Sequence, residues 1–277
     1  MAAKVEINYI RTVISRQLDQ LRKHEKKARQ PPFKESVHQL RVYSRRLDAS
    51  LEVFKKFFPK KKVKAWHAHL RELLKNLGDL RDLEVLIAFL KKHNAKQSLS
   101  TLLNTFEKKM QSLQQGSLSS IEMFRKTNTS AQITDELDHI PKNRTRNLDK
   151  KLAKLSCWSI LKHLEDVNDF RKFVNQPARA DKLHQLRLAL KQLRYVMEVF
   201  DRSYEGELKE FIDHCAKLQT HLGDMHDHEI WLEDKTLGKL KQHIASLKKK
   251  SYKRFRRCWQ QGEKRKNWHR LEKLVKA

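Results

Sequence analysis

Glycine and proline are scarce in this sequence, with six glycines and five prolines among 277 residues. Sheet-rich folds use both residues in their turns and alternate apolar with polar residues along their strands, a pattern that is almost missing here. Apolar residues recur instead at spacings of three and four positions, which is typical of helices. We therefore expect an all-α protein.

Cysteine is also scarce. Cys157, Cys215 and Cys258 are odd in number and form no Cys-x-x-Cys pair, which argues against a disulfide framework or a zinc knuckle and fits a reducing cytosol. Long apolar runs are missing too, since the longest, 83–90, contains Glu84 and is too short to span a bilayer. With no export signal at the N-terminus, we expect a cytoplasmic protein without a membrane anchor.

Acidic residues are too few to balance the basic ones. The chain has 61 Lys and Arg against 33 Asp and Glu, so its formal net charge is +28. A field of this size attracts acidic partners. The apolar fraction of 39% is enough to build a core.

The apolar spacing and the prolines predict eight helices. Pro31, Pro59, Pro141 and Pro177 fall between strongly periodic segments, where a proline can start a helix but does not sit inside one. The expected helices cover 3–29, 33–57, 60–93, 98–127, 142–175, 179–203, 206–236 and 237–273.

The sequence contains an internal repeat. Residues 37–54 match 183–200 at an offset of 146, with 8 of 18 positions identical. A second block follows, in which 77–85 (LGDLRDLEV) matches 222–230 (LGDMHDHEI) at an offset of 145. Two blocks in the same order at nearly the same offset indicate a duplicated unit of four helices with a pseudo-two-fold axis between the copies. The predicted halves are 1–130 and 131–277.

The first repeated block carries a basic stripe along one helix face, at i, i+3 and i+7 spacing, while the opposite face is apolar. Like charges at this spacing repel one another, so an anion should compensate them. Phosphate suits this task, because arginine offers a bidentate fork, lysine a point charge and histidine a titratable donor. The stripe residues are His38, Arg41 and Arg45 in the first copy and His184, Arg187, Lys191 and Arg194 in the second.

These motifs carry a family resemblance. His-x-x-Arg-x-x-x-(Arg/Lys) in two copies, each followed 38 or 39 residues later by Leu-Gly-Asp-x-x-Asp, resembles the CHAD family, the conserved-histidine α-helical domain. The resemblance implies two four-helix bundles related by a pseudo-two-fold axis around a basic central cavity that binds inorganic polyphosphate. It also implies that the seven stripe residues contact this ligand, and it suggests polyphosphate granules as a cytoplasmic location.

Other basic residues are secondary candidates for the same site. The family usually has a further basic residue where this chain has Asp48, and Arg46 has Gln192 as its repeat partner, so we expect the halves to differ. The secondary candidates are Arg46, Arg81, Lys253, Arg256 and Arg257.

The Leu-Gly-Asp blocks are expected to shape the scaffold around the stripes. Gly78 and Gly223 would allow a close helix approach or a bend. Asp82 and Asp227 would orient stripe arginines through charged hydrogen bonds.

Some acid and histidine patterns in the sequence resemble metal sites. Glu35-x-x-His38 and Asp181-x-x-His184 imitate the acid and histidine pairs of helical di-iron proteins. An arginine lies one turn beyond each histidine on the same face, where it would repel a cation. The segment 221–229 (HLGDMHDHE) resembles the His-Asp pair of some phosphohydrolases, but the first copy lacks these histidines. We expect no metal.

No motif predicts catalysis. The sequence lacks a Gly-rich phosphate loop, a Walker-type lysine motif, a Gly-x-Ser-x-Gly elbow, and the Glu-x-Glu-x-Lys motif of the triphosphate-cleaving domain often joined to CHAD modules. We therefore expect a binding protein without enzyme activity or cofactor. Nucleic acid is the alternative partner, because a charge of +28 attracts any phosphate backbone. Tyr43 and Tyr195 provide few aromatic platforms for bases, so phosphate without bases fits the stripes better.

Overall fold

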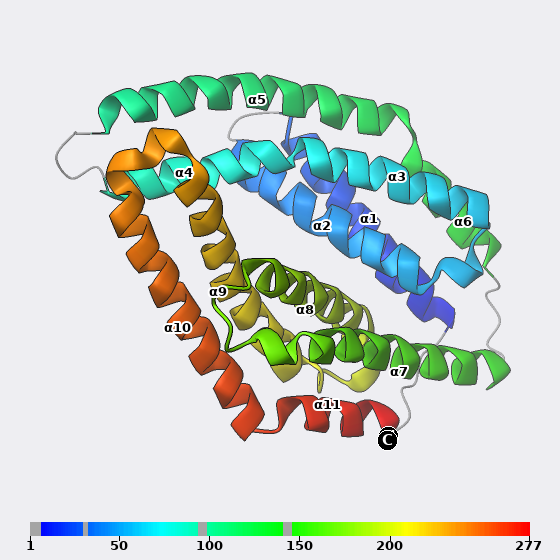
Figure 1. Cartoon of the computed structure of the whole chain (residues 1–277). Coiled ribbons are helices and arrows are strands. Elements are labelled where there is room, and N and C mark those ends of the chain that lie inside the picture. The colour runs from blue at the N-terminus through cyan, green and yellow to red at the C-terminus, as the bar shows by residue number, and fades with distance from the viewer. Residues whose placement is uncertain (1–6, 30–32, 94–98, 141–145) are drawn as a thin grey trace. The chain divides into compact units, whose positions relative to one another are not determined.

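The structure is a computed structural model of the whole chain, and it describes residues 7–29, 33–93, 99–140 and 146–277. These residues form helices joined by short connections and include no strand (Figure 1). The prediction of an all-α protein is confirmed. None of the described helices is both long enough and apolar enough to cross a membrane.

The chain divides into two compact units. The first is Asn8–Asn143, and the second is Arg144–Ala277 together with Met1–Ile7. The predicted division at 130/131 falls inside α6, which belongs to the first unit. Side chains of the first unit hold α6 in place, since Arg22 Nη2 donates to the Ser130 carbonyl over 2.9 Å and Trp66 Nε1 donates to Gln132 Oε1 over 3.0 Å.

The first unit contains four long helical segments, one of which is broken. The broken segment is 60–93, which was predicted as one helix and forms the two helices α3 and α4. The short helix α6 was not predicted. Its elements are α1 (Ile7–Lys27), α2 (Phe33–Val53), the 3-10 turn η1 (Lys55–Phe57), α3 (Lys60–Asn76), α4 (Gly78–His93), α5 (Ser100–Lys126) and α6 (Thr129–His139).

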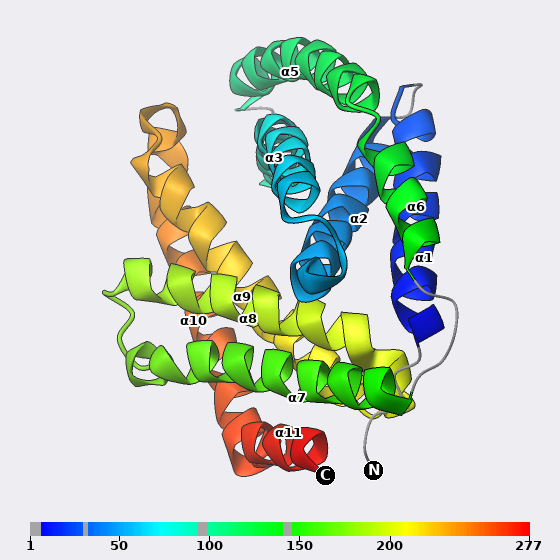
Figure 2. The same cartoon turned by 90° about the vertical axis from the view of Figure 1, so that its right-hand side faces the viewer.

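The described residues of the second unit form four long helices and one short one. In this unit α7 and α8 lie side by side, and α9 packs against both α8 and α10 (Figure 2). Its elements are α7 (Arg146–Asp169), η2 (Arg171–Phe173), α8 (Ala180–Phe200), η3 (Asp201–Tyr204), α9 (Lys209–Glu233), η4 (Lys235–Leu240), α10 (Lys241–Lys264) and α11 (Asn267–Lys276).

Two helix boundaries depend on left-handed backbone conformations. Asn128, between α5 and α6, has φ 52°, which asparagine tolerates better than most residues. Lys266, between α10 and α11, has φ 54° and splits the predicted helix 237–273. Lysine gives no local signal for such a turn, so packing of α11 against α7 in the same unit must favour it.

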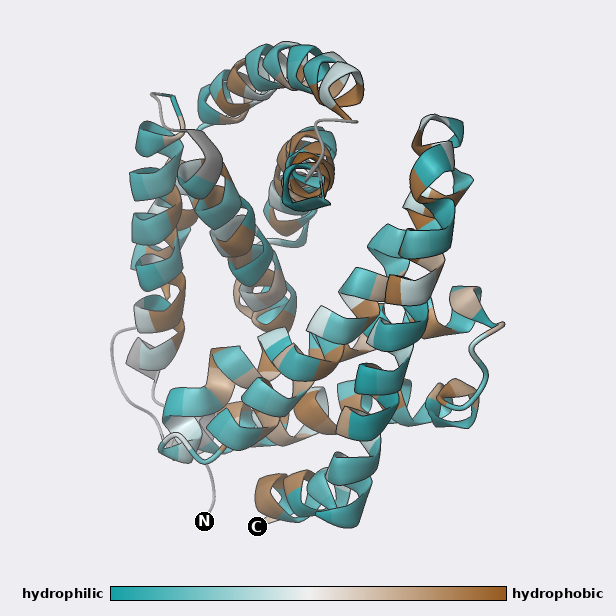
Figure 3. Cartoon of the chain, turned by 90° about the vertical axis from the view of Figure 1, so that its left-hand side faces the viewer, coloured by the Kyte–Doolittle hydropathy of each residue, from teal (hydrophilic) through white to brown (hydrophobic). Residues whose placement is uncertain are grey.

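The cores form from the apolar helix faces that the sequence predicts. On α2 and α8 the positions opposite the basic stripes are completely buried, and each large side chain contributes about 1.5–3 kcal/mol when it leaves water. Figure 3 shows hydrophilic residues along the outer sides of the helices and hydrophobic bands on the sides that face neighbouring helices. The completely buried positions are Leu40, Leu47 and Leu51 on α2, Phe54 directly after α2, and Leu186, Leu193, Met197 and Phe200 on α8.

Candidate functional site

The first basic stripe lies on α2. His38 and Arg45 are half-buried, whereas Arg41 is only 7% exposed. These side chains lie close enough to influence one another, because Arg41 and Arg45 both lower the pKa of His38. The structure therefore brings the three predicted residues together on one helix face.

Arg41 is fixed by the break between α3 and α4. Its Nη1 donates to the carbonyl of Gly78 over 3.0 Å and to the carbonyl of Leu77. The last carbonyls of a helix lack partners within that helix, so Arg41 supplies one at the end of α3. Burial, together with the charge of Arg45, lowers the pKa of Arg41 to about 10, which leaves it protonated at neutral pH.

The nearby acids neutralise the first stripe incompletely. Asp82 lies near Arg41 and partly offsets the lowering of its pKa, but the charged hydrogen bond expected between the two is not formed. Arg45 has neither a hydrogen bond nor an ion pair with any residue that the structure describes. Its charge is available to an anion.

The second stripe lies on α8, and its arginine packs against the other Leu-Gly-Asp block. A β-carbon placed on Gly223 would lie 3.6 Å from Nε and 3.9 Å from Nη2 of Arg187, so the guanidinium lies directly over this glycine. Here α9 continues through Gly223 without a break. The two copies thus place equivalent arginines against equivalent glycines, one at a helix break and one on an intact helix.

The remaining cations of the second stripe differ in how strongly they are neutralised. Arg187 has no ion pair or hydrogen bond within the described residues. Arg194 Nε lies 3.6 Å from Glu198 Oε1, and its guanidinium lies 4.9 Å from the ring centre of Tyr195. Lys191 lies near His184 and lowers its pKa. Arg194 is therefore more compensated than Arg187.

Each motif histidine has a neighbour from the second repeated block. Arg81 lies near His38 and, after burial, is the largest cause of its lowered pKa. In the other copy the His184 and His226 ring centres are 4.3 Å apart. His226 was not among the predicted site residues, although its alignment with Arg81 in the repeat was a signal that could have identified it.

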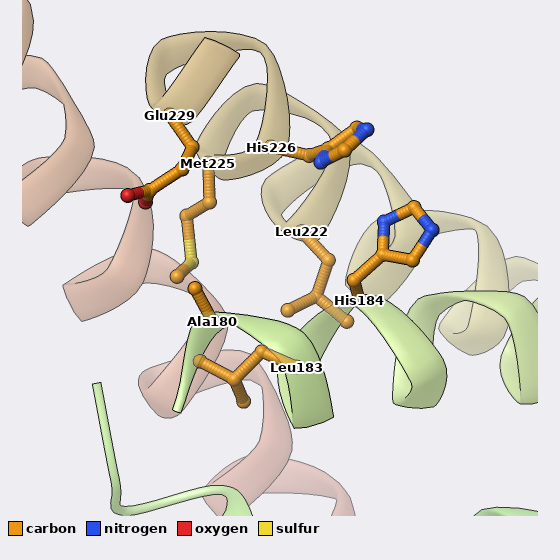
Figure 4. Close-up of a pocket in the computed structure, with 7 residues that line it drawn as sticks. All are labelled: Ala180, Leu183, His184, Leu222, Met225, His226 and Glu229. Carbon is orange, nitrogen blue, oxygen red and sulfur yellow. The ribbon is translucent and has the colours of Figure 1, made fainter. Parts of the chain in front are cut away.

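The two rings border a small pocket with a volume of about 30 Å³ (Figure 4). His184 Nδ1 is buried and has no hydrogen bond among the described residues. Burial lowers the pKa of His184, and Arg187 and Lys191 lower it further. On the far side of the pocket, Glu229 pairs with Lys248 of α10. The full lining is Ala180, Leu183, His184, Leu222, Met225, His226 and Glu229.

The other secondary candidates lie apart from these contacts. The guanidinium of Arg46 lies 5.5 Å from the ring centre of Tyr43. Lys253, Arg256 and Arg257 are exposed on α10. Nothing links these three to a stripe residue, so their role stays a prediction.

The acids of the proposed di-iron pattern are engaged elsewhere. Glu35 Oε1 accepts a hydrogen bond from Gln39 over 2.7 Å, and Asp181 Oδ1 accepts one from Arg179 over 3.3 Å. Within the part of the chain that the structure describes, no group of three or more His, Cys, Asp or Glu side chains is arranged to hold a metal ion.

Comparison with known proteins agrees with these motifs. The family model of the CHAD domain matches residues 12–235. The chain belongs to the CHAD family. Its fold is similar to the crystal structure of the CHAD domain from the plant Ricinus communis, with a TM-score of 0.64, 18% identity, and coverage of 100% of this chain and 93% of that one. PptA from Streptomyces chartreusis gives a TM-score of 0.62 at 15% identity, covering 92% of this CHAD chain and 99% of PptA. No curated protein sequence matches the chain.

Proposed function

We propose that this CHAD protein binds inorganic polyphosphate through both basic stripes and does not catalyse a reaction on it. Membership of the family fits a role connected with polyphosphate. The proposed contacts are His38, Arg41, Arg45, His184, Arg187, Lys191 and Arg194, with Arg81 as a further contact beside His38.

The main support is that each of the two stripes contains an uncompensated arginine. Arg45 and Arg187 have no acidic partner among the described residues, and Arg41 is held rigidly by backbone carbonyls. Phosphate oxygens accept the bidentate hydrogen bonds that such guanidiniums offer, and a positioned arginine loses little entropy on binding.

A linear anion with one charge per repeat suits two stripes better than a compact ligand does. A chain long enough to reach both stripes would contact both, and its affinity would rise with length until both stripes are occupied. Salt would weaken the binding, because much of the attraction is electrostatic.

Binding should be compared for short polyphosphate, long polyphosphate and single-stranded RNA at equal phosphate concentration and ionic strength. We expect long polyphosphate to bind most tightly and RNA most weakly. Equal affinity for RNA would contradict the proposal and favour the nucleic-acid alternative, in which net charge alone attracts any phosphate backbone. The chain length of the recovered polyphosphate should be unchanged after incubation, and shortening would refute the non-catalytic part.

A further inference from the structure

A second basic pocket lies at the corner between α2 and α3, within the first unit. Its volume is about 630 Å³, and it opens to solvent. None of the seven stripe residues lines it. We call it the corner pocket, and its lining is Lys55, Lys56, Phe58, Lys60, Val63, Lys64, His67 and Arg71.

The cations of the corner pocket come from η1 and from one side of α3, where Lys60, Lys64 and Arg71 follow one another at helical spacing. These three and Lys56 are exposed and have no ion pair among the described residues, whereas Lys55 Nζ pairs with Glu52 Oε1 over 2.6 Å. Four uncompensated cations around one hollow repel each other. A ligand with several negative charges would relieve this repulsion.

The floor of the pocket is apolar and packs against the core of the unit. Phe58 and Val63 are 7% and 5% exposed, and the Phe58 ring packs edge-on against Trp66 with centres 5.7 Å apart. The carbon stems of the lysines widen this apolar surface while their ammonium groups reach solvent. A ligand that fits must therefore carry an apolar or aromatic body as well as its charge.

The start of α3 adds donors beside the pocket. His67 also lines the pocket, but it is 8% exposed and both ring nitrogens lie against acids, since Nδ1 bonds to Asp48 Oδ1 over 2.5 Å and the buried Nε2 lies 3.4 Å from Glu52 Oε2. At the start of α3 the N-cap is Pro59, which provides no side-chain cap for the first amides of the helix. Such amides favour an anion.

We propose that the corner pocket binds a phosphorylated small molecule of the nucleoside triphosphate class, with its phosphates among the lysines and its base on the apolar floor. The ligand differs from polyphosphate because it needs an apolar or aromatic group as well as negative charge. The size of the hollow is sufficient for a ligand of this class.

The test is a calorimetric titration with ATP in magnesium-free buffer at fixed ionic strength. We expect Lys60→Ala with Lys64→Ala to weaken ATP binding about tenfold or more, because it removes two phosphate contacts. Both side chains are exposed, so the variant should fold. The matched control is Lys61→Ala with Lys75→Ala, which removes two exposed lysines of the same helix outside the pocket and should change affinity about twofold or less. Equal losses in both variants would overturn the proposal.

Two further titrations distinguish ATP binding in the corner pocket from binding at the stripes and from attraction by net charge. Inorganic triphosphate should bind more weakly than ATP, and equal or tighter binding would refute the role of the apolar floor. Arg187→Ala, in the other unit, should leave ATP affinity unchanged, whereas a large loss would mean that ATP binds at the stripe. Neither result requires that polyphosphate bind the stripes.

Discussion

Replacing Arg45 and Arg187 together by alanine separates positioned charge from net charge. Both guanidiniums are half-buried and unpaired among the described residues, so their removal breaks no ion pair and should not unfold the protein. A hydrogen bond to a charged group is worth about 1.5–3 kcal/mol, and solvent reduces this to about 1–2 kcal/mol for each arginine. The two losses together would weaken polyphosphate binding by about 2–4 kcal/mol, or about 30-fold to 1000-fold.

The control for this experiment is Arg16→Ala with Arg202→Ala. These arginines are exposed, one in each unit, and have no ion pair among the described residues. Each double variant lowers the formal charge from +28 to 28 − 2 = +26, so any difference between them reflects position. Titration of long-chain polyphosphate at physiological salt would measure both. Losses of equal size would refute the stripe hypothesis, since net charge would then account for the binding.

Other predictions follow from the same contacts. Gly223→Ala should keep polyphosphate affinity, because its β-carbon meets Arg187 at an ordinary 3.6 Å. Gly223→Leu should displace the guanidinium and weaken binding about tenfold. Equal affinities of the two variants in a polyphosphate titration would contradict this. Lowering the pH should strengthen binding. Burial lowers the pKa values of His38 and His184, whereas a bound anion favours their protonated forms and so raises these pKa values. As the pH falls, polyphosphate affinity should rise by up to about tenfold for each unit by which the ligand raises a histidine pKa. A flat profile between pH 7.5 and pH 5 would contradict it. Arg41→Met should destabilise the protein by about 1–3 kcal/mol in urea unfolding, because two carbonyls at the α3/α4 break lose their donor, and unchanged stability would argue against that bracing role.

The sequence predicts the helices and the stripes because both depend on local spacing. Apolar residues three and four positions apart identify the buried faces of α2 and α8, and the residues opposite them form the stripes. The pairing of Arg194 with Glu198 was also readable, since the two are four residues apart on one helix. A helical wheel that counts only cations misses this compensation.

The breaks within the predicted helices were harder to read from the sequence. Lys266 has no local preference for ending a helix. Gly78, which directly follows Leu77, was expected to allow a bend, but the equivalent Gly223 lies inside the continuous α9, so glycine alone does not decide the break. Long-range contacts decide these positions, as the bonds from Arg41 to the α3/α4 junction illustrate. Propensity over a short window contains no information about a partner 36 residues away.

The repeat has one further consequence for the site. In both copies the arginine of the histidine motif lies against the glycine of the Leu-Gly-Asp block, although α3 and α4 are separate helices and α9 is continuous. The local backbone differs while the placement of the guanidinium is retained. If the glycine only relieved helix packing, there would be no reason for the arginine to meet it in both backbones. We therefore interpret the Leu-Gly-Asp block as the element that fixes the arginine, and Gly223→Leu tests this reading without altering any charge.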